Sequence, residues 1–190
     1  MTDDGIEVVT ATPQRWDDLV ELFGTRGDAS RCWCQCFVHY GSPEENKAAL
    51  CERMQGQLPP GVLAYEAGQP VGWLRIGPLA EFPSVKRSRS YPQIAGQIGE
   101  DTGSVWQAAC FVVKVGHRRH GVSAALLDGG LCLARAHGAA TVIARPRDTA
   151  VGKTSSVDLY VGALSTFLKA GFAQVGRLGS GRVLVRLDLG

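Results

Sequence analysis

Three cysteines stand at alternate positions in the segment SRCWCQCFVHY, which covers residues 30–40. Thiolate sulfur binds zinc and takes part in redox chemistry, so Cys32, Cys34 and Cys36 are candidates for either role, with His39 as a fourth metal ligand. On a strand, however, alternate residues lie about 6.6 Å apart on one face, too far for one tetrahedral zinc site. The C-x-x-C spacing of many metal sites is also absent. We therefore expect a segment between the first two helices whose cysteines pack in the core without a metal, and keep a metal or redox role as a third alternative.

A second segment with chemical potential is FVVKVGHRRHGVSAALL, residues 111–127. Its pattern predicts a buried strand, a basic turn and an amphipathic helix. The first amides of a helix lack partners within it and carry partial positive charge, so such a turn suits a phosphate or pyrophosphate. Gly121 permits close backbone approach, Ser123 adds a hydroxyl, and Arg118 and Arg119 add charge. A basic turn that merely caps the helix is the alternative.

The residues from Val113 to Ser123 resemble the coenzyme A motif of the GNAT superfamily of N-acetyltransferases, Arg/Gln-x-x-Gly-x-Gly/Ala after a strand. Ser123 stands where the family has glycine or alanine. The stretch from Tyr160 to Phe172 is similar to the family's fourth helix, Asn-x-x-Ala-x-x-x-Tyr-x-x-x-Gly-Phe, and keeps the alanine and the Gly-Phe pair. The Cys-Trp-Cys segment and the run RPRD at 145–148 resemble a bacterial subgroup of this family.

This resemblance implies an acetyl-CoA-dependent N-acetyltransferase, in which a primary amine of a small molecule or protein attacks the thioester directly. It also implies two diverging central strands, backbone pairing with the pantetheine arm, and turn amides that hold the pyrophosphate. The positions expected to bind coenzyme A are Val113, Val115, Arg118, Arg119, His120, Gly121, Val122 and Ser123.

The catalytic groups are less well defined, because the sequence departs from the family at two functional positions. The tyrosine that often protonates the leaving thiolate is Phe167 here, and Tyr160, about two helical turns earlier, is the substitute candidate. The strand predicted at 105–115 contains no carboxylate to act as the base. Candidates for the base are Glu100 and Asp101 before this strand and Asp148 after the next one, each with a surface carboxylate as the alternative.

In this family the first two helices, the loop between them and strand-end loops form the acceptor site. The resemblance therefore places Trp33, Cys34, Tyr91 and Trp106 near the acceptor, with core packing as the alternative for each. Such an aromatic pocket would suit an amine with an apolar body, but the sequence does not identify it. Phe167 and the missing strand carboxylate motivate a runner-up function, a non-catalytic acyl-CoA-binding or regulatory module.

The elements that must position these groups follow from hydrophobic periodicity and turn residues. Expected strands are 6–9, 62–65, 71–76, 105–115, 141–145 and 181–189, and expected helices begin near residues 13, 43, 122 and 162. The order β-α-α-β-β-β-α-β-α-β predicts an α/β fold with helices on the faces of a mixed sheet. With the resemblance, we expect one GNAT-type domain over residues 1–190, its central sheet mostly antiparallel.

Composition sets the remaining limits. The 190 residues are 45% hydrophobic and 20% charged, with a net charge of +2, which is typical of a soluble globular protein and does not indicate a nucleic-acid partner. No apolar stretch reaches the roughly 20 residues that span a bilayer, so no membrane partner is expected. The acidic start differs from a signal peptide, which predicts a cytoplasmic protein with reduced thiols. Homodimers are common in the family, but the sequence carries no specific signal for one.

Overall fold

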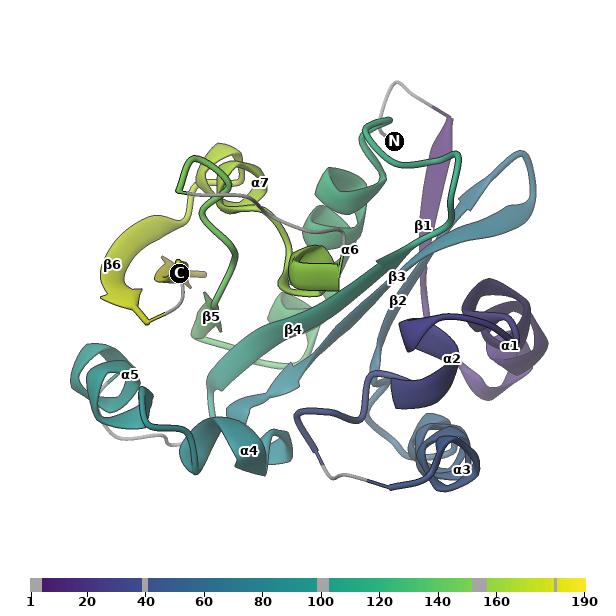
Figure 1. Ribbon diagram of the computed structural model, residues 1–190, viewed down its shortest axis with the longest axis horizontal. Helices are drawn as coiled ribbons and strands as arrows, with labels where there is room; N and C mark the ends of the chain where they lie inside the picture. The colour runs from purple at the N-terminus through teal and green to yellow at the C-terminus, as the bar shows by residue number, and fades with distance from the viewer. Residues whose placement is uncertain (1–4, 39–40, 99–102, 152–156, 180) are drawn as a thin grey trace.

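The computed structural model describes residues 5–38, 41–98, 103–151, 157–179 and 181–190. Its centre is a seven-stranded sheet with the order β1-β2-β3-β4-β5-β7-β6 (Figure 1). Neighbouring strands are antiparallel, except that β4 and β5 are parallel. The strands are β1 (Ile6–Thr10), β2 (Gly61–Glu66), β3 (Gln69–Pro78), β4 (Val105–Val113), β5 (Thr141–Ala144), β6 (Ala173–Leu178) and β7 (Arg182–Asp188).

Helices cover both faces of this sheet and divide the core in two. The long helix α6 packs on β1 to β4 and shares one apolar cluster with α7, while α1 packs on β3 from the opposite face and shares a second cluster with α3 (Figure 1). The helices are η1 (Pro13–Arg15), α1 (Trp16–Phe23), α2 (Asp28–Cys32), α3 (Pro43–Met54), η2 (Leu79–Glu81), α4 (Pro83–Lys86), α5 (Tyr91–Ile98), α6 (Val122–Ala136), η3 (Val157–Val161) and α7 (Leu164–Lys169). The predicted mixed α/β architecture is confirmed.

Local sequence signals account for several of the element ends. Ser42 and Glu45 form the predicted capping box at the start of α3, with bonds of 3.2 and 2.7 Å. Ala67 and Gly68 both have positive φ, 49° and 77°, as the tight turn between β2 and β3 requires. Gly138, at φ +75°, ends α6.

The parallel strands β4 and β5 separate part of the way along β4. They pair only from Val105↔Thr141 to Ala108↔Ala144, whereas β4 continues to Val113 and stays paired with β3. The 3-10 helix η3 lies against β4, and Phe167 of α7 contacts Phe111 edge to face, with ring centroids 6.0 Å apart. The diverging central strands implied by the family resemblance are therefore present.

The structure adds to the sequence expectations at three places. Residues 32–36 do not form a strand: α2 ends at Cys32, and Trp33 and Cys34 adopt left-handed φ of 44° and 52°, which no strand accommodates. The long connection before β4 contains the short helices α4 and α5. The sequence also gave no sign of β6, because this edge strand is mostly solvent-accessible and lacks apolar alternation.

A search of the described residues for a membrane-spanning helix gave none of the required length and hydropathy.

Candidate functional site

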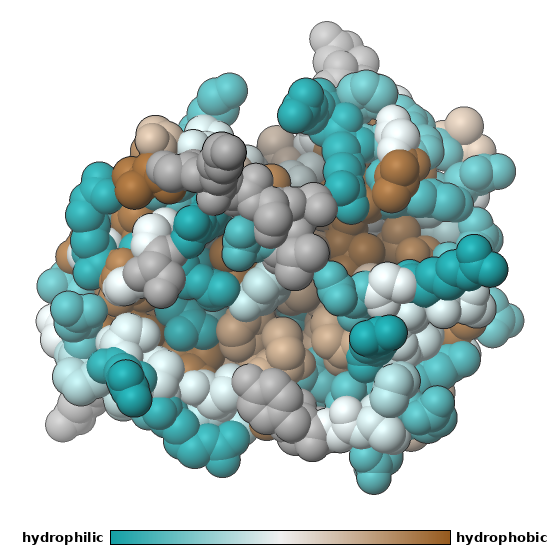
Figure 2. All heavy atoms as spheres, in the orientation of Figure 1, coloured by the Kyte–Doolittle hydropathy of each residue, from teal (hydrophilic) through white to brown (hydrophobic). Residues whose placement is uncertain are grey.

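A pocket of about 210 Å³ opens where β5 ends. Phe37 and Tyr160 belong to the core cluster of α1 and α3, so the pocket lies on the sheet face opposite α6. This side of the molecule is hollowed and shows hydrophobic residues in the hollow beside hydrophilic ones (Figure 2). The lining residues are Cys36, Phe37, Ser84, Ser88, Arg145, Tyr160 and Arg182.

Arg145 follows β5 directly and is the main electrostatic feature of this pocket. Its side chain is buried, with 8% exposure for the residue, and its guanidinium carbon lies 5.4 Å from the centre of the Phe37 ring. Within the described part of the chain, the guanidinium has no carboxylate partner and no hydrogen-bond acceptor. Burial, and then the charge of Arg182, lower the pKa of Arg145 to about 10. The group therefore stays cationic at neutral pH, which is costly for a buried charge without a counter-ion.

Arg182 and Tyr160 form the neighbouring wall. Arg182, at the start of β7, donates a hydrogen bond of 2.8 Å from Nη2 to the Tyr160 hydroxyl. The Tyr160 ring packs 5.9 Å from the ring of Phe37. Tyr160 belongs to η3 and not to the helix that carries Phe167, because Gly162 has a left-handed φ of +81° between them. Phe167 itself is fully buried.

Two serine hydroxyls complete the lining. Ser84 Oγ donates to the Phe37 carbonyl at 2.7 Å, and Ser88 Oγ donates to the Val85 carbonyl at 2.6 Å. Because these protons are committed to backbone carbonyls, the hydroxyls offer only lone pairs to a ligand. The charged hydrogen-bond donors of the pocket are its guanidinium groups, and Tyr160, whose hydroxyl accepts from Arg182, keeps its own proton as well.

The turn between β4 and α6 forms a second unusual arrangement. Gly116, Arg119 and Gly121 have left-handed φ of 97°, 66° and 82°, and the non-glycine Arg119 is strained there. In the described structure, the backbone amides from Arg118 to Ser123 donate to no protein acceptor. Consecutive exposed amides in a turn with alternating hand make a concavity that suits an anion.

Contacts on both sides hold this turn in place. The Lys114 amide donates to the Val71 carbonyl at 2.9 Å, and its ammonium lies 3.1 Å from Glu21 of α1. His117 Nδ1 lies 2.5 Å from a Glu66 carboxylate oxygen on β2. The turn is therefore fixed to β2, β3 and α1.

The structure brings most of the expected coenzyme A positions together in this turn. Arg118, Arg119, His120 and Gly121 are exposed, and Ser123 is half-buried. Val122 points into the core and leaves only its amide for a ligand, whereas half-buried Val113 ends β4. Val115 lies beyond the strand and is 82% exposed, so it is not a strand-pairing position.

The residues expected near the acceptor, Trp33, Cys34, Tyr91 and Trp106, do not line this pocket, and their assignment stays a prediction. Trp33 is buried and stacks on Phe23, with centroids 4.9 Å apart. Trp106 is buried in the α6-face cluster, Tyr91 packs on the other cluster, and Cys34 is fully buried. The segment after α2 contributes Cys36 and Phe37 instead.

Asp148, the candidate base that the structure describes, does not line the pocket. Asp148 is buried, and its two oxygens accept from the Ala150 amide at 3.1 Å and from Arg177 at 3.3 Å. Glu100 and Asp101 lie outside the described residues.

The cysteine side chains lie closer together than alternate residues on a strand would. Cys34 and Cys110 have their sulfurs 3.0 Å apart. Hydrogen bonds from the Cys34 and Cys36 thiols lower the pKa of Cys32, while burial raises the pKa of Cys34 and the bond to Cys32 raises that of Cys36. All six cysteines are free thiols, and the described side chains include no group of three or more ligands arranged for a metal ion. His39 falls outside the described residues.

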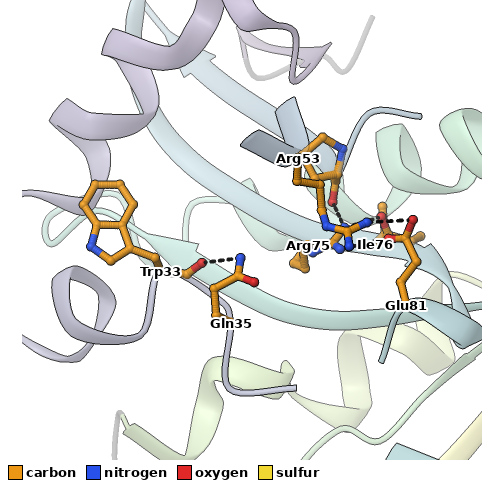
Figure 3. Close-up of polar contacts among 7 residues, drawn as sticks. Trp33, Gln35, Arg53, Arg75, Ile76 and Glu81 are labelled. Atoms are coloured by element: carbon orange, nitrogen blue, oxygen red, sulfur yellow. Dashed lines mark hydrogen bonds and ion pairs between the residues drawn. The ribbon is translucent and has the colours of Figure 1, made fainter. Parts of the chain in front are cut away.

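A second pocket, of about 480 Å³, contains a different type of arginine site. Arg75 is fully buried and donates 2.9 and 2.6 Å bonds to Glu81 and to the Pro60 carbonyl (Figure 3). Arg53 pairs with the other Glu81 oxygen at 2.8 Å, and both Arg53 and Glu81 line the pocket. Gln35, also on its wall, donates to the Trp33 carbonyl (Figure 3). The guanidinium charges of this region already have a carboxylate.

Arg145 and Arg182 were not among the residues predicted for the site. A partial signal existed, because Arg145 directly follows the apolar run TVIA and the ends of central parallel strands commonly carry ligand-binding residues. Arg182 had no such signal, since its position beside Tyr160 depends on the pairing of β7 with β5.

No protein-family model matches the sequence, and no curated protein matches it. Solved structures do match. The GNAT domain of PAT from S. lividans has a TM-score of 0.59 at 17% identity, over 96% of this chain and 90% of that one. The PaiA N-acetyltransferase from Thermoplasma acidophilum, in complex with coenzyme A, has a TM-score of 0.53 at 13% identity, over 96% and 98%. GphF, a GNAT-like decarboxylase in complex with isobutyryl-CoA, has a TM-score of 0.56 at 18% identity, over 97% and 100%. The chain therefore has the GNAT fold.

Proposed function

We propose that this chain is an acetyl-CoA-dependent N-acetyltransferase of the GNAT superfamily that acetylates a primary amine. The observation that carries the proposal is the turn after β4, where consecutive amides from Arg118 to Ser123 have no acceptor among the described residues at the start of α6. The matching structures with bound coenzyme A or isobutyryl-CoA support an acyl-CoA ligand. A bacterial source, a cytoplasmic location and the oligomeric state stay predictions from the sequence.

The donor is bound by the turn and by the free edge of β4. Amides of the turn and the positive end of the α6 dipole hold the pyrophosphate, and Arg118 and Arg119 add charge. The pantetheine arm lies along β4 beyond Ala108, where β5 no longer pairs with it. The thioester then reaches the gap between β4 and β5. The acceptor amine approaches from the pocket, which lies on the sheet face opposite α6.

The chemical step is a direct transfer. The neutral amine nitrogen forms a bond to the thioester carbonyl carbon, the C–S bond breaks, and its electron pair leaves on the sulfur of coenzyme A. The nitrogen loses one proton and the sulfur gains one. Tyr160 is the proposed donor to sulfur, because its hydroxyl accepts from Arg182 and keeps its own proton available. Arg182 also stabilises the phenolate that this donation leaves.

A non-catalytic acyl-CoA-binding module is the second candidate, and Phe167 favours it. The family's tyrosine would contribute a proton donor at this position, whereas this buried ring is packed between Phe111 and Phe172. Coenzyme A binding without turnover over a broad amine panel would support this candidate. Turnover that is lost in Tyr160→Phe would exclude it.

The test is acetyl-CoA binding measured by calorimetry on Gly121→Glu. The substitution places a carboxylate in the turn and strains a residue at φ +82°, so we expect at least a tenfold weaker affinity. Gly138→Glu is the matched control: it adds the same charge at φ +75° at the other end of α6 and leaves affinity unchanged. Wild-type protein that binds no acetyl-CoA at millimolar concentration would overturn the proposal.

A further inference from the structure

The buried pocket arginines indicate what kind of amine the acceptor is. We propose that Arg145 and Arg182 bind a carboxylate on the acceptor, so that the substrate is a small amine carrying a carboxylate group. This inference rests on the proposed function, since it assigns the acceptor of the same site. It replaces the apolar-bodied amine that the sequence interpretation suggested.

The first step is the missing counter-ion. Arg145 is buried over the face of the Phe37 ring, and among the described residues no carboxylate is paired with its charge. A cation–π contact offsets only a small part of what burying an isolated ion costs. A bound carboxylate supplies the missing charge and accepts two parallel hydrogen bonds from the planar guanidinium.

The second step is the reinforcement of this charge by Arg182. Its guanidinium lies beside the Tyr160 ring, 5.3 Å from the centroid, and uses one Nη2 donor for the hydroxyl. A guanidinium has five N–H donors, so further donors of Arg182 remain for the same ligand. The mutual repulsion of the two cations contributes to the lowered pKa of Arg145. An anion between them relieves it.

The third step is the size and polarity of the remaining wall. At about 210 Å³ the pocket is smaller than the roughly 300–1,000 Å³ typical of sites for larger ligands, so the acceptor is a small molecule. Ser84 and Ser88 present lone pairs, which accept from the amine N–H groups, while the aromatic rings of Phe37 and Tyr160 flank the short carbon skeleton. A carboxylate at one end and an amine at the other match these two walls.

The Arg75–Glu81 pair beside the second pocket provides the internal comparison. There, a buried guanidinium is paired with Glu81, so its charge is compensated within the protein. The chain therefore compensates a buried arginine where the arginine is structural. The absence of such a carboxylate beside Arg145, in the described part of the chain, is specific to the site where a ligand must bind.

The test is a transfer assay on matched amine pairs. L-amino acids and ω-amino acids are each compared with their own carboxamides, with acetyl-CoA as donor. We expect kcat/KM to be at least tenfold higher for the carboxylates, although the α-amino carboxamides have the lower amine pKa and more neutral nucleophile. Ethanolamine phosphate is included, and a phosphate preference would overturn the carboxylate assignment. Equal rates within the pairs would overturn it as well.

Variants assign the effect to the residues. Arg145→Met should raise KM for the carboxylate about 10- to 100-fold and remove the preference within each pair. Arg182→Met should raise KM and reduce the preference for the carboxylate to a smaller extent. Arg145→Lys should retain part of this preference. Arg53→Met removes the same charge from the other pocket and should leave the preference intact. A preference that survives both Arg145→Met and Arg182→Met would overturn the proposal.

A calorimetric arm separates this proposal from the transferase activity. N-acetylglycine and N-acetylglycinamide are titrated into the protein without coenzyme A. If N-acetylglycine binds, N-acetylglycinamide does not, and Arg145→Met abolishes the binding, the anion site is supported. This holds even if no amine is acetylated, and then only the proposed function fails. Equal binding of the two probes, or no binding of the carboxylate, would overturn the anion site whatever the transfer assay shows.

Discussion

Arg75 and Arg145 are both buried arginines on the same side of the sheet, and both guanidinium groups lie over a phenylalanine ring. Arg75 lies 5.0 Å from the Phe82 centroid and Arg145 lies 5.4 Å from that of Phe37. Burial lowers the pKa of each. They differ in their counter-charges: Glu81 lies 2.9 Å from Arg75, whereas no described carboxylate lies beside Arg145.

This difference separates a charge that belongs to the fold from a charge that belongs to a ligand. The Arg75–Glu81 pair joins β3 to η2 and also bonds the Pro60 carbonyl before β2. Arg145 faces a pocket and makes no hydrogen bond that joins it to another of the described elements. The sequence alone does not distinguish these two arginines. Removing Arg75 should affect folding, whereas removing Arg145 should affect binding.

The largest expected effect comes from breaking the compensated pair. Glu81→Gln leaves the fully buried Arg75 without its counter-charge, so we expect the free energy of unfolding to fall by about 3–5 kcal/mol. Urea denaturation followed by circular dichroism measures this loss. Glu52→Gln, on the same pocket wall, is the control and should change stability by less than about 0.5 kcal/mol. A Glu81→Gln loss no greater than that of the control would remove the structural role of the pair.

The opposite sign is expected at the uncompensated arginine. Arg145→Met removes a buried charge without leaving an unpaired carboxylate, and methionine fills similar space. We expect the free energy of unfolding to stay constant or to rise by up to about 2 kcal/mol, even though acceptor binding is lost. The same urea experiment measures it. A destabilisation above about 2 kcal/mol would mean that Arg145 supports the fold as Arg75 does.

The smallest effect is the pH dependence of carboxylate binding. The pKa of Arg145 is about 10 in the ligand-free protein, below its ordinary 12.5, and a bound carboxylate raises it. The affinity for the carboxylate is therefore highest below pH 10, where Arg145 is charged. It falls by up to tenfold per pH unit as the pH rises above 10. Calorimetry with N-acetylglycine between pH 8 and 11 tests this, because the probe has no titrating amine. A constant affinity over this range would show that Arg145 does not supply the charge.

Much of the fold was predictable because its signals are local. The capping box at Ser42, the hairpin at Ala67 and Gly68, and the apolar run of β4 each depend on a few neighbouring residues. The turn at Arg118 to Ser123 was also visible as a basic, glycine-containing junction between a strand and a helix.

The acceptor pocket was not predictable in the same way. Its residues come from five separate parts of the chain, and Arg145 meets Phe37 only through tertiary packing. Sequence also does not show whether an arginine is paired, since Glu81 and Arg75 meet through the turn after β3. The family resemblance placed Trp33 and Trp106 near the acceptor, whereas the structure buries both in the core.

Gly162 makes two neighbouring aromatic positions independent of each other. Its left-handed backbone separates η3 from α7, and a Cβ at this position would lie 2.8 Å from the Phe167 ring and 3.1 Å from Phe111. Phe167 is therefore constrained by the core cluster of α6, while Tyr160, two residues before the break, packs on Phe37 and accepts a hydrogen bond from Arg182 at the pocket wall. Because the two aromatic residues belong to different clusters on opposite faces of the sheet, a change at Tyr160 does not repack the core around Phe167.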